Sequence, residues 1–355
     1  MKFWITIGLI LVLSAVGLTY EIAAGRVLAP FFGTSLLTWT AVIATVLAGF
    51  SLGSALGGLV AERERSRATG NVRSALVATA VLMALSPTVL ALIYDGGARG
   101  TGGMLLAVFL TFFPPSVLVT LPSPLLARLA VEARPGREGS SLGFVLAAGS
   151  VGAIFGAILA GFVALPLVGS TATFAACGAV ALLCLPFVRS GAPGGGIGDA
   201  QTGRAEPHPV VVIAAAGFVA VAGLAGGAAC RYESGLSCLH VVQEGGEVRL
   251  LSDRTVQAAE RIARDAETGD GPGLALPYTQ WIWARMDRDL GPAPSVLFVG
   301  GGGYTLPSKL LADRPAARAV AVEIDPLVTR VVRRHLPRAG TMIERTGYNA
   351  DGEDR

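Results

Sequence analysis

The sequence predicts an α-helical transmembrane bundle followed by a partial, Rossmann-like α/β domain, with a small β-region between them. Of the 355 residues, 52% are hydrophobic and only 15% are charged, whereas soluble domains carry about 25% charged residues. Up to residue 229 the apolar residues form runs of the length that crosses a bilayer. After residue 230 charges become frequent and the apolar residues form short sets with strand or helix spacing.

Seven apolar runs are long enough to cross a membrane, and they predict a multi-pass protein of the cell membrane surrounded by the lipid bilayer. They cover roughly residues 3–24, 36–60, 74–94, 104–132, 142–168, 170–188 and 209–229. We interpret the first as an uncleaved span, because no clean small-x-small cleavage site follows it. The fourth contains Pro114, Pro115, Pro122 and Pro124. Proline removes a backbone donor, so we expect this span to be kinked or broken.

Glycines recur at helical spacing within two of these spans. The second span contains Gly49, Gly53 and Gly57, and the fifth contains Gly149, Gly152 and Gly156. Small residues four apart let another helix approach closely in lipid. We therefore expect helix packing at these faces, either within the chain or between copies in a homo-oligomer. A substrate path lined by backbone is the alternative.

The charge distribution bears on partners and on orientation. A net charge of +3 and a pI near 8.8 are too mild to predict binding to nucleic acid. Loops after the second and fourth spans carry Arg63, Arg65, Arg67, Arg73, Arg128, Arg134 and Arg137. The opposite loops carry only Arg26 and Arg99. The positive-inside rule places the arginine-rich loops in the cytoplasm. Seven full spans would put the C-terminal region outside, but one run that does not cross would reverse this, and the sequence leaves both open.

Cysteine and histidine spacing predicts neither a disulfide framework nor a metal site. The four cysteines, Cys177, Cys184, Cys230 and Cys238, form no C-x-x-C pair, and two of them lie in an apolar run. His208, His240 and His335 are scattered along the chain. One ionisable residue in the first span, Glu21, is a candidate for a substrate or proton role.

The soluble region carries a nucleotide-type signature. Residues 294–299 (PSVLFV) predict a strand, which leads through Gly300, Gly301, Gly302 and Gly303 into a helix-compatible stretch. A second predicted strand, 319–322, ends at Glu323, and Asp325 with Pro326 suits the start of another helix. This order is the first half of a doubly wound nucleotide-binding sheet. We therefore divide the chain into a helical domain (1–229), a small β-region with a connecting helix (230–290) and an incomplete nucleotide-binding domain (291–355).

Glycines and a carboxylate in this register predict a ribose-containing ligand. The candidate ligand-binding residues here are Gly300, Gly301, Gly302, Gly303, Glu323 and Asp325. Glycines let the backbone approach a ligand, and a helix N-terminus offers free N–H groups. Glu323 lies 21 residues after Gly302, where an acidic side chain accepts hydrogen bonds from ribose hydroxyls. The motif alone does not separate dinucleotides from S-adenosyl ligands, and a purely structural glycine turn is the alternative.

Residues 299–305 (VGGGGYT) and 322–325 (VEID) resemble the spermidine synthase (polyamine aminopropyltransferase) family, more closely its members fused to a membrane domain. The segment around Tyr232–Ser234, Gln257 and residues 20–39 of the first spans extends the resemblance over nearly the whole chain. It implies a transferase with decarboxylated S-adenosylmethionine, or S-adenosylmethionine, as ligand and a polyamine as acceptor. It also implies that Gly300 and Gly302 line the ligand, that Glu323 holds the ribose, that Gln257 and Tyr278 lie near donor or acceptor, and that Asp351 contacts adenine.

Three departures from the family affect the expected activity. Gly303 stands where the family has an aspartate for the donor's amine, and Leu236 replaces a tyrosine. The family's catalytic aspartate belongs to a later strand and loop than this sequence includes, so the resemblance leads us to expect a C-terminally incomplete enzyme with no assignable catalytic residue and no metal. Two classes remain open: an adenosyl-binding membrane enzyme or its remnant, and a transporter or scaffold with a regulatory or vestigial nucleotide module.

Overall fold

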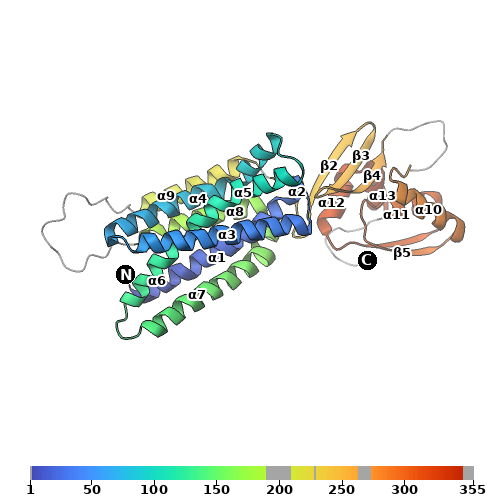
Figure 1. Cartoon of the computed structure of the whole chain (residues 1–355). Helices are drawn as coiled ribbons and strands as arrows, with labels where there is room; N and C mark the ends of the chain where they lie inside the picture. The colour runs from blue at the N-terminus through green and yellow to red at the C-terminus, as the bar shows by residue number, and fades with distance from the viewer. Residues whose placement is uncertain (1, 189–208, 228, 263–272, 347–355) are drawn as a thin grey trace. The chain divides into compact units, whose positions relative to one another are not determined.

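The computed structural model describes residues 2–188, 209–227, 229–262 and 273–346. The chain separates into two compact units, Met1–Ala229 and Cys230–Arg355 (Figure 1). The first is helical and the second mixes strands with helices. Each is described by itself.

Long apolar helices make up the first unit. Their bounds are α1 Phe3–Val27, α2 Ala29–Phe32, α3 Leu36–Ala61, α4 Arg65–Asp95, α5 Gly100–Thr120, α6 Pro122–Glu132, α7 Glu138–Leu159, η1 Ala160–Ala164, α8 Leu165–Leu183, η2 Leu185–Phe187 and α9 Pro209–Ala225. Five continuous helical segments among the described residues are long and apolar enough to cross a membrane, and α9 is a shorter apolar helix. The unit therefore has the character of a membrane protein.

Two of the helical segments each contain more than one helix. The predicted fourth span passes from α5 to α6 at Leu121, immediately before Pro122, where the backbone angles stay helical (φ −53°, ψ −34°), and Pro114 and Pro115 are accommodated inside α5. The segment Glu138–Phe187 includes two of the predicted spans, and Gly169 within it has φ 80° and ψ 175°, outside the helical region. The expected count of seven spans is therefore not shown by segment length alone, because five long segments and one short helix replace seven separate runs.

Buried residues gather at two ends of the helical unit. We call the first the arginine-rich end, because it adjoins Arg65, Arg128 and Arg134. Its cluster takes residues from the start of α1, the end of α3, the start of α4, α6, the end of α8 and the start of α9: Phe3, Ile7, Ala61, Ala68, Leu129, Leu185 and Val212. We call the second the opposite end. Its cluster includes Val27, Leu28, Ala41, Leu90, Met104 and Leu165, with Ala229 packed against it. Successive helices therefore run between the two ends in alternating directions.

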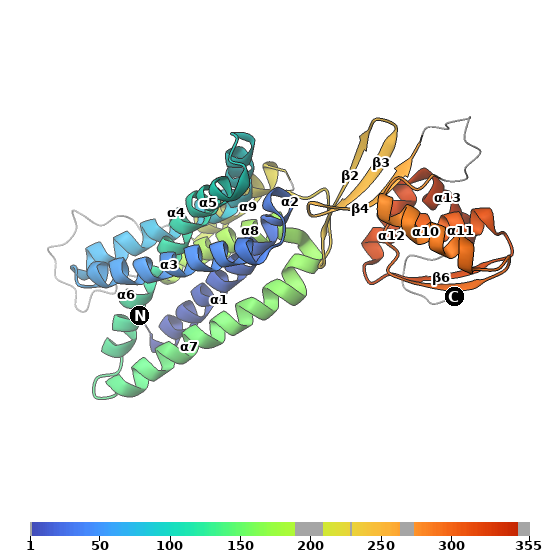
Figure 2. The same cartoon turned by 45° about the vertical axis from the view of Figure 1, so that its right-hand side comes forward.

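The glycine faces are covered by helices of the same chain. A Cβ at Gly53 or Gly57 would overlap the carbonyl oxygen of Val117 or Leu121, so α3 and α5 lie backbone to backbone. A Cβ at Gly152 or Gly156 would likewise overlap carbonyl oxygens of α1. Figures 1 and 2 both draw α1 beside α7. These faces are thus used for packing within the chain, and the homo-oligomer stays a prediction.

The second unit begins with a four-stranded antiparallel sheet in the order β1-β2-β3-β4. The strands are β1 Tyr232–Glu233, β2 Cys238–Glu244, β3 Glu247–Ser252 and β4 Thr255–Arg261. Leu250 and Ala258 from this sheet pack with Tyr304, Val332 and Leu336 in one buried cluster. The sheet therefore supports the glycine loop and the helices that follow.

The rest of the second unit alternates strand and helix in the predicted order. It comprises α10 Pro277–Asp289, β5 Ser295–Val299, α11 Thr305–Asp313, β6 Arg318–Val322, α12 Pro326–His335 and α13 Pro337–Thr346. β5 and β6 pair in parallel, with Ser295 opposite Arg318 and Val299 opposite Val322. Leu297, Val299, Val320 and Val322 are 56–87% exposed on one face. The described residues thus form a two-stranded parallel sheet with one open face, short of a complete Rossmann-like fold.

Candidate functional site

The glycine loop between β5 and α11 needs glycine for two different reasons. Gly300 and Gly302 have φ values of 93° and 52°, a region that residues with a side chain enter at a penalty. Gly301 and Gly303 instead make close contacts, since a Cβ there would meet the Tyr304 ring or overlap Ala258 of β4. Tyr304 itself has φ 55°. Its hydroxyl shares a hydrogen bond of 2.7 Å with Thr329 of α12, which fixes the end of the loop.

Glu323 points into this loop. Its Oε2 accepts hydrogen bonds from the amides of Gly301 at 2.8 Å and Gly302 at 3.3 Å. Its Oε1 accepts one from the amide of Asp325 at 3.0 Å. The carboxyl ends of β5 and β6 lie side by side because the strands are parallel, so the loop and the carboxylate meet at one edge of the sheet. The structure therefore brings together the two features that the sequence predicts to share a ligand.

The hydrogen bonds that Glu323 already accepts limit the number of ribose hydroxyls that its carboxylate can bind. An ionised carboxylate has about four acceptor positions, and three are occupied by backbone amides. One position remains for a ligand hydroxyl. Holding both ribose hydroxyls, as the sequence predicts, requires that one loop amide release the carboxylate. The amides also fix the carboxylate in place, which is a form of preorganisation.

Asp325 has a structural task in this conformation. Its Oδ1 accepts a hydrogen bond from the amide of Leu327 at 2.9 Å, which confirms the predicted cap of α12. Its Oδ2 accepts one from the Ser234 hydroxyl at 2.5 Å. The residue is 5% exposed. Asp325 therefore joins the residue after β1 to the start of α12 and faces away from solvent, and its contact with a ligand stays a prediction.

Gln257 and Tyr278 lie beside the loop. The Tyr278 hydroxyl donates a hydrogen bond of 3.1 Å to the carbonyl of Gln257. A Cβ at Gly302 would come 4.0 Å from that same carbonyl. Partial burial raises the pKa of the Tyr278 hydroxyl above its ordinary value, so it remains a donor at neutral pH. These two residues join the glycines and Glu323 in one neighbourhood, whereas Asp351 lies outside the described residues.

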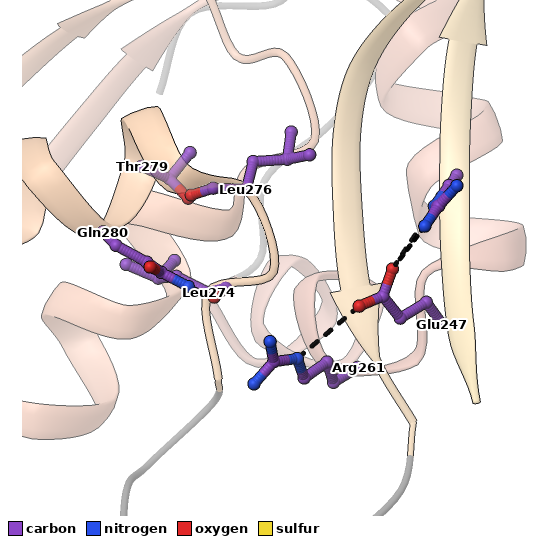
Figure 3. A network of polar contacts seen from close by, with 7 residues as sticks. Glu247, Arg261, Leu274, Leu276, Thr279 and Gln280 are labelled. Atoms are coloured by element: carbon purple, nitrogen blue, oxygen red, sulfur yellow. Dashed lines mark hydrogen bonds and ion pairs between the residues drawn. The ribbon is translucent and has the colours of Figure 1, made fainter. Parts of the chain in front are cut away.

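Hydrogen bonds hold the start of α10, the helix that carries Tyr278 (Figure 3). Gln280 Nε2 donates to the carbonyl of Leu274 at 2.7 Å, and Thr279 Oγ1 donates to that of Leu276 at 2.7 Å. Leu274 in turn bridges to Glu260 of β4. Figure 3 also shows Glu247 between two cations, with Arg261 Nε at 3.6 Å. These contacts hold the first turn of α10, and with it Tyr278, against β4.

Glu260 fixes the other side of β4. Its two carboxylate oxygens accept hydrogen bonds from the amides of Arg338 at 3.1 Å and Ala339 at 3.0 Å, at the start of α13. Burial raises the pKa of Glu260 above its ordinary value, although the two amides and the Arg338 charge oppose that shift. The residue is 4% exposed. No local sequence pattern predicts this role, because it depends on a helix start 78 residues later in the chain.

A disulfide joins Cys230 and Cys238, which corrects the expectation from cysteine spacing. The chain turns back between Cys230 and β2, so that two cysteines eight residues apart come together. No short sequence motif predicts this pairing. His240 Nε2 lies 3.0 Å from the Cys238 sulfur, and the three potential ligand atoms lie within 4.8 Å of one another. His240 is therefore not isolated as expected. The two sulfurs are bonded to each other, so they offer no thiolates to a metal in this state.

Comparisons with known proteins find no match: no family model, no curated protein and no solved structure resembles the chain significantly. The resemblance to polyamine aminopropyltransferases thus stays a prediction from the motifs. Ser234 and Tyr304 are positioning residues that the sequence analysis did not assign. Ser234 lies in the segment on which the resemblance rests, and Tyr304 directly follows the glycines, so both had a local signal.

Proposed function

We propose that the protein is a membrane-embedded, spermidine synthase-like protein whose second unit binds an adenosyl nucleoside, either decarboxylated S-adenosylmethionine or S-adenosylmethionine. The proposal rests on one observation: the Glu323 carboxylate meets the amides of Gly301 and Gly302 at the carboxyl ends of two parallel strands. Ligands of open α/β sheets bind at this edge. Gln257 and Tyr278 add polar groups beside it.

Aminopropyl transfer to a polyamine is the reaction that the resemblance favours. Such a transfer needs a base for the acceptor amine and anionic groups to hold a polycation. Among the described residues around the loop, Glu323 is committed to backbone amides and Asp325 is committed to Leu327 and Ser234. We therefore propose ligand binding for this chain and assign no catalytic residue.

The finer architecture belongs to the same proposal. We propose that the parallel pair β5–β6 is the first part of a Rossmann-like sheet and that the helical unit crosses the bilayer seven times. In support of seven crossings, a 50-residue segment would be about 75 Å long as a straight helix, far beyond a bilayer core of about 30 Å, and Gly169 divides it. Helix α9 has 17 residues, about 25 Å, close to the shortest spanning length.

Isothermal titration calorimetry on the full chain in detergent tests the binding proposal. The probes are S-adenosylmethionine, its decarboxylated form and methylthioadenosine, together with the 2′-deoxy analogue of methylthioadenosine. We expect binding, and we expect Glu323→Gln to weaken it about tenfold or more, because a charge-assisted hydrogen bond is lost. The glutamine oxygen can still accept from Gly301 and Gly302, so these two loop bonds should persist, while the Asp325 amide loses its acceptor.

Two controls separate ribose recognition from general damage. Glu244→Gln, at an exposed position of β2, should leave binding unchanged. The 2′-deoxy analogue should bind more weakly than its parent to the wild-type chain, and this difference should shrink in Glu323→Gln. The absence of heat with all adenosyl probes would contradict the proposal. So would equal affinities in wild-type and Glu323→Gln.

A transporter is the second candidate, and one observation favours it. Glu21 is half-buried within the first apolar helix, where ionisable residues usually serve a function. A vesicle assay that detects proton-coupled uptake of a polyamine, abolished by Glu21→Gln but unchanged by Glu323→Gln, would favour this candidate. Loss of uptake in neither variant would remove the support that Glu21 gives it.

A further inference from the structure

We infer that the second unit lies on the non-cytoplasmic, oxidising side of the membrane, closed there by the Cys230–Cys238 disulfide. The inference rests on the proposed seven crossings and on the disulfide, which is an independent observation. It does not depend on any ligand.

The direction of each helix follows from contacts within the helical unit. Gly152 and Gly156 of α7 pack against Leu11 and Ala15 of α1 in the same order, so these two helices run parallel. The buried cluster at the arginine-rich end joins the end of α3 to the start of α4, and α6 to the end of α8. Alternation between the two ends therefore continues through α8. Val212, near the start of α9, belongs to the arginine-rich end as well.

The chain leaves the helical unit at the opposite end. Ala229 packs against the cluster that contains Val27 and Leu90, and its amide donates a hydrogen bond of 3.4 Å to Thr171 Oγ1, two residues after the break at Gly169. Cys230 follows directly. The first residue of the second unit is therefore joined to the end of the bundle away from the arginine-rich loops.

The distribution of arginines assigns the two ends of the helical unit to the two sides of the membrane. The arginine-rich end carries Arg63, Arg65, Arg67, Arg73, Arg128, Arg134 and Arg137, while Arg26 and Arg99 belong to the opposite end. Lysine and arginine in short loops stay on the cytoplasmic side. The opposite end, where Ala229 lies, then faces away from the cytoplasm.

The disulfide independently places the second unit outside the cytoplasm. Forming it removes two protons and two electrons from the Cys230 and Cys238 thiols, and a protein disulfide of the oxidising compartment accepts both electrons by thiol–disulfide exchange. Such bonds persist outside the cytoplasm and are rare within it. Both cysteines are at most 5% exposed, so the bond is shielded from reductants once formed. Cys177 and Cys184, buried in the helical unit, remain thiols.

Two measurements test the inference without a destabilising variant at the cysteines. Trypsin cleaves after Arg231 and Arg249, so Cys230 and Cys238 fall in separate peptides, 205–231 and 232–249. Alkylated, non-reduced wild-type protein should yield these two peptides as one cross-linked species by mass spectrometry. Their recovery as separate alkylated peptides would overturn the disulfide.

Orientation is measured by labelling in intact cells that express the full chain. Gln243→Cys places a thiol at an exposed position of β2, and Ser66→Cys places one at the exposed start of α4. A membrane-impermeant maleimide should label Gln243→Cys in intact cells and Ser66→Cys only after permeabilisation, with the wild-type chain as the blank. Labelling of both from the same side, or the reverse pattern, would overturn the inference. Calorimetry in detergent is independent of orientation, so failure of ligand binding is distinguished from failure of this assignment.

Discussion

Glycine serves different purposes in the two units. In the helical unit, Gly53 and Gly156 have ordinary helical backbones, and what they provide is the absence of a side chain where two helices meet. In the second unit, Gly300 lies in open space, yet its φ of 93° demands glycine. Spacing distinguishes the two uses in the sequence: four residues apart for helix contact, and consecutive for a loop. The number of glycines alone does not distinguish these two uses.

The two units also satisfy their polar side chains differently. In the second unit, the buried Glu260 and the half-buried Glu323 each face backbone amides, because an amide pair compensates for lost hydration. In the helical unit polar burial relies on hydroxyls, such as Tyr20 and Ser86, which share a hydrogen bond of 2.8 Å. In each unit, polar side chains away from solvent therefore form hydrogen bonds with backbone amides or with other side chains of the same unit.

The largest expected effect is at a glycine that makes helix contact. Gly53→Ala should lower the stability of the helical unit by about 3 kcal/mol, because the added Cβ overlaps the backbone of α5 and forces the helices apart. Thermal unfolding in detergent measures it. Gly58→Ala on the same helix is the control, since nothing lies within 4 Å of its Cβ. Equal melting temperatures for the two variants would contradict the close packing of α3 and α5.

An intermediate effect is expected from the buried carboxylate on β4. Glu260→Ala should lower the stability of the second unit by about 2 kcal/mol, because the amides of Arg338 and Ala339 lose their acceptor. Hydrogen exchange over α13 measures it, and Glu244→Ala at the exposed end of β2 is the control. Unchanged protection of α13 would show that the cap is unimportant.

Glu260 also predicts a pH dependence. Because burial raises its pKa above the ordinary value of 4.5, the folded state binds the proton more tightly than the unfolded state. The stability from protonation is therefore full below that ordinary pKa and is lost as the pH rises through the folded pKa. Denaturant unfolding should show that wild-type gains more stability than Glu260→Gln as the pH falls from neutral toward 4.5.

The smallest effect is expected at a glycine chosen for its backbone. Gly300→Ala should destabilise the second unit by about 1 kcal/mol, because alanine resists positive φ although its Cβ meets no atom within 4 Å. Gly291→Ala, which is equally open and has no positive φ, should be close to neutral. Denaturant unfolding of both variants sharpens the distinction between steric and backbone glycines. A larger loss at Gly291 would reverse it.

The sequence predicts the helical unit well where the signal is local. Apolar runs place α3 within a residue or so of Leu36–Ala61, and the division between the fifth and sixth predicted spans coincides with Gly169. The cap at Asp325 is also local and is confirmed. The Cys230–Cys238 pair and the Glu260 cap were not foreseeable, because both depend on how strands bring distant backbone together. The bonds from Gly301 and Gly302 to Glu323 depend on a side-chain conformation that spacing does not specify.

The three amides around Glu323 have a consequence for ligand selection. Converging N–H groups at a glycine loop ordinarily attract the phosphates of nucleotides, but here a negative charge built into the chain already satisfies them. A pyrophosphate would have to displace that charge and would be repelled by it. Under the proposed binding function, this loop disfavours phosphorylated ligands such as dinucleotides and ATP, and it favours nucleosides that carry a neutral or cationic group at their 5′ position.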